Sequence, residues 1–265
     1  MSDGSRCVDV LRWREGDRRV DTDAVVEECA IALSYNGDAH AVMMATPIDL
    51  EDYALGYSLS EGIIDAPGEL RVADTLRRGD GLVLELVIPQ TRFDALASRT
   101  RRTLGNSACG LCGSEALLDA LRPMPRVVAH EVAPADVVVA LARFAAWQTL
   151  NRATGGAHAA AWCVGDEIRV VREDVGRHNA FDKLVGALAR AGFDAREGYA
   201  IISSRASYEL VHKAATAGIG TLVAISAPTS AAIDGAKRCG LLLIGFARDG
   251  AMNVYTQTAS TEYEP

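Results

Sequence analysis

The sequence predicts an α/β protein, and two patterns in its second half support this class. Short apolar runs alternate with amphipathic stretches, in the order YAIISS, SYELVHKAATAG, TLVAIS, SAAIDGAKRCG and LLLIGFA. The apolar runs are continuous, as expected of strands that are covered on both faces. Such alternation implies at least three parallel strands joined by helical crossovers.

Three further segments complete this half of the chain. PADVVVALARFAAWQTLN predicts a helix with Pro134 in its first turn. AHAAAWCVGDEIRVVRED predicts two strands that turn at Gly165-Asp166. NAFDKLVGALARAGF predicts a helix that Gly192 can end, and its apolar stripe consists of Phe181, Leu184, Val185 and Leu188.

The first hundred residues predict a smaller α+β unit. Two β-like runs flank Asn36-Gly37, a dipeptide that favours a type I′ hairpin turn. DLEDYALGYSLSEGI predicts a helix that ends near Gly62, and GLVLELVIP predicts a strand. LRPMPRVV carries two prolines and is the best candidate for a linker. We therefore predict one domain over residues 1–125 and a second over residues 126–265.

Composition restricts the class of protein. The net charge of −8 argues against a nucleic-acid partner, which requires a basic surface. Apolar runs such as LLLIGF are too short to span a bilayer, and the N-terminus has neither the apolar run nor the charge pattern of a signal peptide. We therefore expect a cytoplasmic protein that does not bind membranes.

Cys109 and Cys112 form the motif CGLCG, whereas the other four cysteines are isolated. The pair could serve redox exchange, metal binding or covalent sulfur chemistry, or it could have no function. A structural zinc site usually has two such pairs, and there is no second pair, so no metal site is expected. A thioredoxin-like motif follows a buried strand, whereas RTRRTLGNSA before this pair is basic and predicts irregular structure.

A nucleophilic thiolate is the remaining chemistry for the pair. Arg99, Arg101 and Arg102, with a helix N-terminus predicted at Ser114, would lower a cysteine pKa. Glycines flank both cysteines and would give the loop backbone freedom. We therefore predict a mobile segment over about residues 100–114, which suits a carrier of a chemical group.

Polar residues follow the predicted parallel strands, where ligands bind in open α/β sheets. Ser203, Ser204 and Arg205 precede a helix and could bind an anion, unless they form an ordinary turn with Ser207 as N-cap. REDVGRHNAFDK, which contains His178, is equally dense in polar groups; the alternative is a solvated loop in which Asn179 caps a helix.

His158 follows a Gly-Gly turn and resembles the zinc-binding histidine of nucleoside deaminases. Those enzymes need a catalytic Glu two residues later, where this chain has Ala160, and a cysteine pair downstream rather than upstream. The sequence therefore argues against deamination even if the fold is shared, and a structural role is the commoner one for such a histidine.

Five motifs in this chain together resemble the formate dehydrogenase accessory sulfurtransferase family, FdhD: CGLCG, TGGAHAAAW, REDVGRHNAFDKLVGAL, SSRASYELVHKAATAGI and LLIGFARDGAMNVYT. TPIDLEDYALGYSLSEGII is also similar to the family's N-terminal segment. The resemblance extends from about Val25 to Thr256, and DAVVEECAIALSYNGDAHAVMMA matches only loosely.

The resemblance implies a function and a fold. Family members take sulfur from a cysteine desulfurase as a cysteine persulfide, and pass it to the molybdenum or tungsten bis(guanine dinucleotide) cofactor of formate dehydrogenase. Cys109 matches the persulfide-carrying residue and Cys112 its companion. The implied fold is a cytidine deaminase-like three-layer domain beside the smaller α+β domain, in a homodimer.

The cofactor would bind at the strand ends as a substrate, and GDP or GMP could occupy part of its site. The family's cofactor-binding stretch matches Phe246, Ala247, Arg248, Asp249, Gly250 and Ala251. Ser203 and Arg205 are the further candidates that the strand-end argument supplies, and His178 is the candidate from the polar segment REDVGRHNAFDK. Two other functions stay open, a non-catalytic chaperone that only binds cofactor and a thiol-disulfide oxidoreductase.

Overall fold

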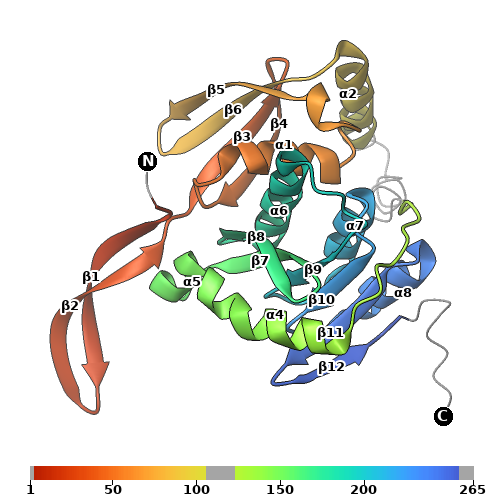
Figure 1. The fold of residues 1–265 in the computed structure, drawn as a ribbon. Coiled ribbons are helices and arrows are strands. Elements are labelled where there is room, and N and C mark those ends of the chain that lie inside the picture. Colours follow the sequence, from red (N-terminus) through yellow and green to blue (C-terminus); the bar gives the residue numbers. More distant parts are fainter. Residues whose placement is uncertain (1–2, 106–122, 257–265) are drawn as a thin grey trace, which may run out of the picture.

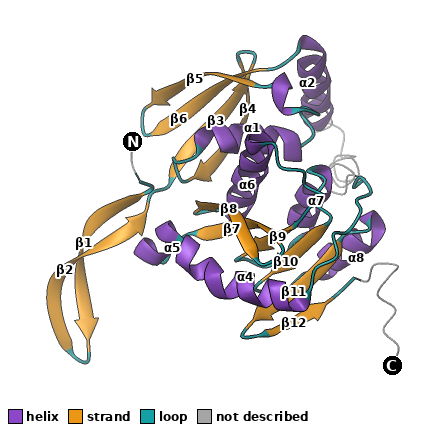
Figure 2. Cartoon of the chain, viewed as in Figure 1, coloured by secondary structure: helices purple, strands orange, loops and turns teal. Residues whose placement is uncertain are grey.

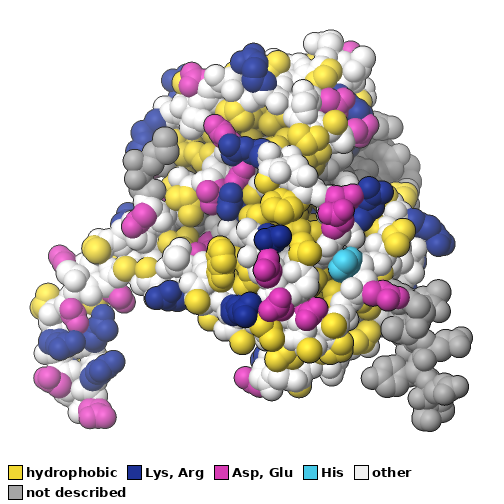
Figure 3. Space-filling model, in the orientation of Figure 1, with side chains coloured by type: hydrophobic (Ala, Val, Ile, Leu, Met, Phe, Trp, Pro, Cys, Tyr) yellow, Lys and Arg dark blue, Asp and Glu magenta, His cyan; other side chains and the backbone are white. Residues whose placement is uncertain are grey.

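The computed structural model describes residues 3–105 and 123–256 of the chain. In these ranges the strands form a six-stranded, a four-stranded and a two-stranded sheet (Figure 1). Helices pack against the two larger sheets, whereas the two-stranded sheet extends away from the rest of the molecule (Figure 2). Acidic and basic side chains gather on the outer part of this extension (Figure 3). The chain is therefore a mixed α/β protein, as predicted.

The six-stranded sheet has the strand order β12-β11-β10-β9-β7-β8. Its three central strands β9, β10 and β11 run parallel, which confirms the predicted alternation, and the other three are antiparallel to their neighbours. The strands are β7 (His158–Val164), β8 (Glu167–Asp174), β9 (Tyr199–Ile202), β10 (Thr221–Ala224), β11 (Leu242–Arg248) and β12 (Ala251–Val254).

Helices cover both faces of this sheet and produce three layers. Ala200 and Ile202 of β9 belong to a core shared with α6, α7 and α8, whereas Tyr199 and Ile201 of the same strand pack in the core on the α4 side. This double coverage explains why the strands are apolar at every position. The helices are α4 (Pro134–Trp147), α5 (Thr149–Thr154), α6 (Arg177–Ala191), α7 (Tyr208–Thr216) and α8 (Ser230–Cys239).

The helix predicted after Pro134 is in fact two helices that meet at Gln148. The carboxylate of Glu173 on β8 accepts hydrogen bonds from the backbone N–H groups of Leu150 and Asn151, both at 2.8 Å. The N–H groups in the first turn of a helix have no partner within the helix, and this carboxylate accepts hydrogen bonds from two of them. It therefore favours the start of a new helix, α5, at this point.

The four-stranded sheet has the order β4-β3-β6-β5, and one of its faces packs against α1 and α2. Asn36 and Gly37 have φ angles of +51° and +94°, which fits the predicted type I′ turn. The elements are β3 (Cys29–Tyr35), β4 (Asp38–Ala45), α1 (Leu50–Ser60), the 3₁₀ turn η1 (Pro67–Glu69), β5 (Arg71–Arg78), β6 (Gly81–Val87) and α2 (Gln90–Gly105).

The two-stranded sheet consists of β1 (Ser5–Arg14) and β2 (Asp17–Val26), paired along their whole length. Our sequence analysis did not predict this hairpin. Arg12 forms ion pairs with Asp21 and Asp23 across the two strands, and these charges interrupt the apolar alternation that identifies a strand.

The basic stretch before the cysteine motif is helical where the structure describes it. Helix α2 continues to Gly105, so the prediction of irregular structure for RTRRTLG was wrong. The two-domain division at residue 125 stays a prediction, because that boundary adjoins the undescribed residues 106–122.

Candidate functional site

The parallel strands end at one edge of the six-stranded sheet, and three helices begin there. Helix α6 follows β8, α7 follows β9 and α8 follows β10. Because β7 and β8 are antiparallel to each other, His158 at the start of β7 lies opposite Asp174 at the end of β8, at this same edge. Free N–H groups at helix N-termini favour anions, so this edge suits a phosphorylated ligand.

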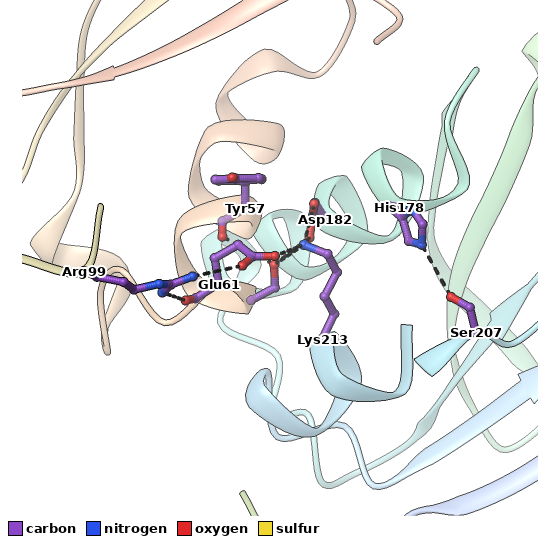
Figure 4. Close-up of polar contacts among 8 residues, drawn as sticks. Tyr57, Glu61, Arg99, His178, Asp182, Ser207 and Lys213 are labelled. Carbon is purple, nitrogen blue, oxygen red and sulfur yellow. Dashed lines mark hydrogen bonds and ion pairs between the residues drawn. The ribbon is translucent and has the colours of Figure 1, made fainter. Parts of the chain in front are cut away.

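Ser203 and His178 both lie at this edge, each beside a second polar side chain. The hydroxyl of Ser203 accepts a hydrogen bond from the Ala159 N–H at 2.9 Å and lies 3.5 Å from His158 Nδ1. His178 Nε2 lies 3.4 Å from the hydroxyl of Ser207, the N-cap residue of α7 (Figure 4). His158, which we expected to have only a structural role, therefore adjoins a candidate site residue.

Arg177 begins α6 beside these histidines. Its Nε atom is buried and has no hydrogen-bond partner among the described residues. Burial, and then the charge of Arg177, lower the pKa of His178 to about 4, and the same two causes lower the pKa of His158. The edge thus has neutral imidazoles next to a guanidinium N–H that the described residues leave unpaired, which fits an anionic ligand.

The segment REDVGRHNAFDK is neither a solvated loop nor a helix cap. Helix α6 begins at Arg177, and the Asn179 side chain donates to the Met44 carbonyl at 2.8 Å and to Asp174 at 3.0 Å. The Lys183 ammonium lies 2.7 Å from Asp174 Oδ2, with both side chains fully buried. Most polar groups of this segment therefore hold the fold together, and His178 and Arg177 remain as candidates for binding.

Two further candidates lie at the ends of parallel strands: Arg205 follows β9, and Phe246 lies near the end of β11. Arg205 is exposed, and the next residue, Ala206, bridges to Pro228 in the loop after β10. Phe246 has a φ of +50°, and its N–H donates to the Ser226 carbonyl at 3.1 Å. The left-handed backbone is uncommon for an aromatic residue, and here it accompanies a register shift between β11 and β12.

The other residues of FARDGA form the tip of the β11–β12 hairpin. Asp249 and Gly250 have φ angles of +54° and +76°, and Arg248 lies 5.8 Å from the centre of the Phe246 ring. This tip and helix α4 enclose a hollow of about 370 Å³, a size that fits a small ligand. Its lining residues are Val138, Leu141, Ala142, Ile225, Ala247, Arg248, Asp249, Gly250 and Ala251.

The hollow offers apolar walls with a guanidinium and a carboxylate at its rim. Such walls can contact the faces of a flat base, while a carboxylate can accept hydrogen bonds from ring N–H groups. All the strand-end residues named from the sequence thus lie along one edge, although their binding role stays a prediction.

Cys109 and Cys112 lie outside the described residues, as does the predicted helix start at Ser114. Of the segment predicted to be mobile, residues 100–105 belong to α2 and the rest is likewise outside. The description resumes beside α8: the Met124 side chain lies 2.9 Å from the position that a Cβ on Gly235 would take, and Tyr208 of α7 lies 3.6 Å from it. Met124, near the start of the second described range, therefore lies between α8 and the start of α7.

Two further properties of the described part bear on its chemistry. Residues 3–105 and 123–256 contain no cluster of three or more His, Cys, Asp or Glu side chains suited to a metal ion. Nor does any helix in these ranges combine the length and apolar character that a bilayer crossing needs.

Similarity to known proteins covers most of the chain. Residues 26–261 match the sequence profile of the FdhD/NarQ family. The sulfur carrier protein FdhD of Bordetella petrii is 44% identical over 98% of this chain and 95% of its own. That of Xanthomonas euvesicatoria pv. vesicatoria is 49% identical over 96% and 91% of the two chains.

A solved structure shows a similar fold. It is the crystal structure of a protein from Desulfotalea psychrophila that is proposed to be a formate dehydrogenase accessory protein. It superposes with a TM-score of 0.75 at 21% identity, over 96% of this chain and 97% of that one. The family profile and the curated relatives show that the chain belongs to the FdhD/NarQ family.

Proposed function

We propose that this protein is a sulfurtransferase required for formate dehydrogenase activity, with Cys109 as the residue that carries sulfur. The observation that carries this proposal is the CGLCG motif in a chain that is 44–49% identical to proteins named sulfur carriers. A carrier needs a nucleophilic thiol and a place to bind the acceptor. The motif provides the first, and the sheet edge of α6, α7 and α8 is suited to the second.

Loading of the carrier is an exchange between two sulfur atoms. The Cys109 thiolate attacks the outer sulfur of a persulfide on a cysteine desulfurase, and forms a new S–S bond while the donor's S–S bond breaks. The donor cysteine leaves as a thiolate, so Cys109 becomes a persulfide and no external oxidant or reductant is needed. Cys112 is the companion thiol of this step.

The acceptor is the molybdenum or tungsten bis(guanine dinucleotide) cofactor, bound as a substrate. Two features of the sheet edge support binding of its phosphates and guanine: the unpartnered Nε of Arg177, and the hollow beside Arg248 and Asp249. Ser203, Arg205, His178 and Phe246 would contribute to the same surface, and GDP or GMP would bind there as a fragment. The chain would act as a cytoplasmic homodimer, with the cysteine motif closing a first domain and the cofactor bound to a second.

Two alternatives make different predictions. A chaperone that only binds cofactor would not need either cysteine, and the intact motif therefore favours the carrier. A thiol-disulfide oxidoreductase would cycle between dithiol and disulfide, so a redox titration of the cysteine pair separates it from a carrier. The helix α2, and not a buried strand, precedes the pair, which also argues against a thioredoxin-like motif.

Complementation of cells that lack their own FdhD protein tests the proposal. Wild type and Cys7→Ala, a change at an exposed and isolated cysteine, should restore formate dehydrogenase activity. Cys109→Ala should leave the dehydrogenase inactive at an equal level of expressed protein. Full activity with Cys109→Ala would contradict the carrier role and favour the chaperone.

A further inference from the structure

A buried ammonium group joins three helices next to the candidate cofactor edge. Lys213 of α7 lies 2.9 and 3.0 Å from the two carboxylate oxygens of Asp182 on α6, and 2.9 Å from Glu61 Oε1 after α1 (Figure 4). It also donates to the hydroxyl of Ser60 at 3.1 Å, and its side chain is 8% exposed. Although burial opposes its charge, Asp182 and Glu61 together raise the pKa of Lys213, so the group is an ammonium at neutral pH.

Helix α2 adds a second cation to these groups. The Lys213 ammonium contacts the carboxylates of both Asp182 and Glu61. The guanidinium of Arg99 on α2 lies 3.7 Å from Glu61 Oε2 and donates to the Glu61 backbone carbonyl at 3.2 Å. A partly buried carboxylate attracts a guanidinium more strongly than an exposed one, so Glu61 draws the second half of α2 onto the core.

Helix α2 has a second polar contact at its other end. In its first turn Arg92 pairs with Glu69 at 3.1 Å and also with Asp65. Arg92 therefore resembles Arg99 in pairing with a carboxylate, but it lies at the end of α2 that is farther from the cysteine motif in the sequence. Arg99, in contrast, lies in the half of α2 that leads toward Cys109 in the sequence.

Resting on the proposed function, we propose that Glu61 is a positioning residue for sulfur transfer. By binding Arg99 and Lys213 together, it fixes the end of α2 from which the cysteine motif departs against α7, whose N-terminus lies at the candidate cofactor edge. Glu61 itself touches neither sulfur nor cofactor in this role. Its loss should therefore slow delivery of sulfur, without affecting loading of Cys109 or binding of nucleotide.

The test compares Glu61→Gln, Arg99→Gln and the double variant with Arg99→Lys and with the control Glu69→Gln. Glu61→Gln keeps the Asp182–Lys213 pair, so the α6–α7 contact should survive. Hydrogen exchange of residues 97–105 reports the docking of the α2 end. Cyanide converts the loaded sulfur to thiocyanate and so counts it, and activation of apo formate dehydrogenase in the presence of cofactor reports its delivery.

In Glu61→Gln and in Arg99→Gln, we expect hydrogen exchange at the end of α2 to become about tenfold faster and delivery of sulfur to become about tenfold slower. This is the size expected for loss of one charge-assisted contact. The double variant should be no worse than Arg99→Gln, because both lose every contact of the Arg99 guanidinium with Glu61. Glu61→Gln keeps the hydrogen bond from Arg99 to the Glu61 backbone carbonyl, so its effect should be equal to or smaller than that of Arg99→Gln. Arg99→Lys should retain most delivery. Glu69→Gln should loosen only the start of α2, with thiocyanate yield and GDP affinity unchanged in every variant.

Two results would overturn the role of Glu61. One is unchanged exchange at the end of α2 in both single variants, and the other is wild-type delivery despite faster exchange. Neither resembles failure of the proposed function, in which the wild-type protein itself would take up no sulfur.

Discussion

Gly186 on α6 lies so close to Asp52 on α1 that a Cβ added to Gly186 would be 1.9 Å from the Asp52 carbonyl oxygen. The contact is reciprocal, because a Cβ on Gly56 of α1 would be 1.7 Å from the Asp182 carbonyl oxygen of α6. The two helices therefore meet backbone to backbone, which only glycine permits. This crossing attaches the four-stranded sheet and its helices to the three-layer part of the chain.

Gly186→Ala should destabilise the protein by at least about 2 kcal/mol, because the added methyl group meets backbone rather than a movable side chain. Gly68→Ala is the control, since no atom of the described residues outside its own chain neighbours lies within 4 Å of its would-be Cβ, and it should change stability by less than about 0.5 kcal/mol. Urea unfolding measures both. Equal stability of the two variants would show that the helices can separate at little cost.

Loss of Lys183 should leave a buried carboxylate without its cation. Lys183→Met should cost about 3–5 kcal/mol in urea unfolding, because Asp174 beside it is fully buried. The exposed pair of Arg196 and Asp194 is the control, and Arg196→Met should change stability far less, because solvent screens an exposed ion pair. Adding Asp174→Asn to Lys183→Met should recover part of the loss. A small effect of Lys183→Met would contradict the buried ion pair.

His178 should make the fold less stable in acid. Its pKa is lowered to about 4 in the folded protein from an ordinary value of 6.5, so between these two pH values the unfolded chain binds a proton that the folded protein does not. The contribution of His178 to the free energy of unfolding is therefore complete above about pH 6.5, and it is lost as the pH falls toward 4. His178→Gln should lose less stability than wild type between pH 7.5 and pH 4.5. Parallel losses in the two proteins would contradict the lowered pKa.

Nucleotide binding should depend on the arginines of the sheet edge. Isothermal titration with GDP should show weaker binding to Arg205→Ala and Arg248→Ala, by about tenfold each if one charge-assisted contact is lost. Affinity for wild type should also fall as salt rises, since charge pairing supplies part of it. Arg196→Ala, at an exposed pair away from this edge, should bind as wild type does. Unchanged affinity in both edge variants would place the nucleotide elsewhere.

The sequence predicted the three-layer half of the fold well, because its strands are covered on both faces and are apolar at every position. Asn36-Gly37 was equally informative, since few other residues accept positive φ at both turn positions. The β1–β2 hairpin was missed because its surfaces carry ion pairs such as Arg12 with Asp21. The helical end of α2 was missed because arginines there suggested a loop.

The candidate site was predictable only as far as topology determines it. Strand ends in a parallel sheet must share an edge, so Ser203 and Arg248 could be assigned to it from sequence. The unpartnered Nε of Arg177 depends on what packs around it, which no local pattern shows. Likewise Glu61 and Lys213 are separated by 152 positions, and their contact follows from the packing of α1 against α6 and α7.

The central claim, that Cys109 carries sulfur, is tested most directly by intact-mass spectrometry after incubation with a cysteine desulfurase and cysteine. Wild type and Cys7→Ala should gain the mass of one sulfur atom, which cyanide should remove. Cys109→Ala should gain none, and a peptide digest of the wild-type protein should locate the added sulfur on Cys109. If Cys109→Ala gains the same cyanide-labile sulfur as wild type, or if wild type gains none from an active desulfurase, the account of Cys109 as a persulfide carrier is wrong.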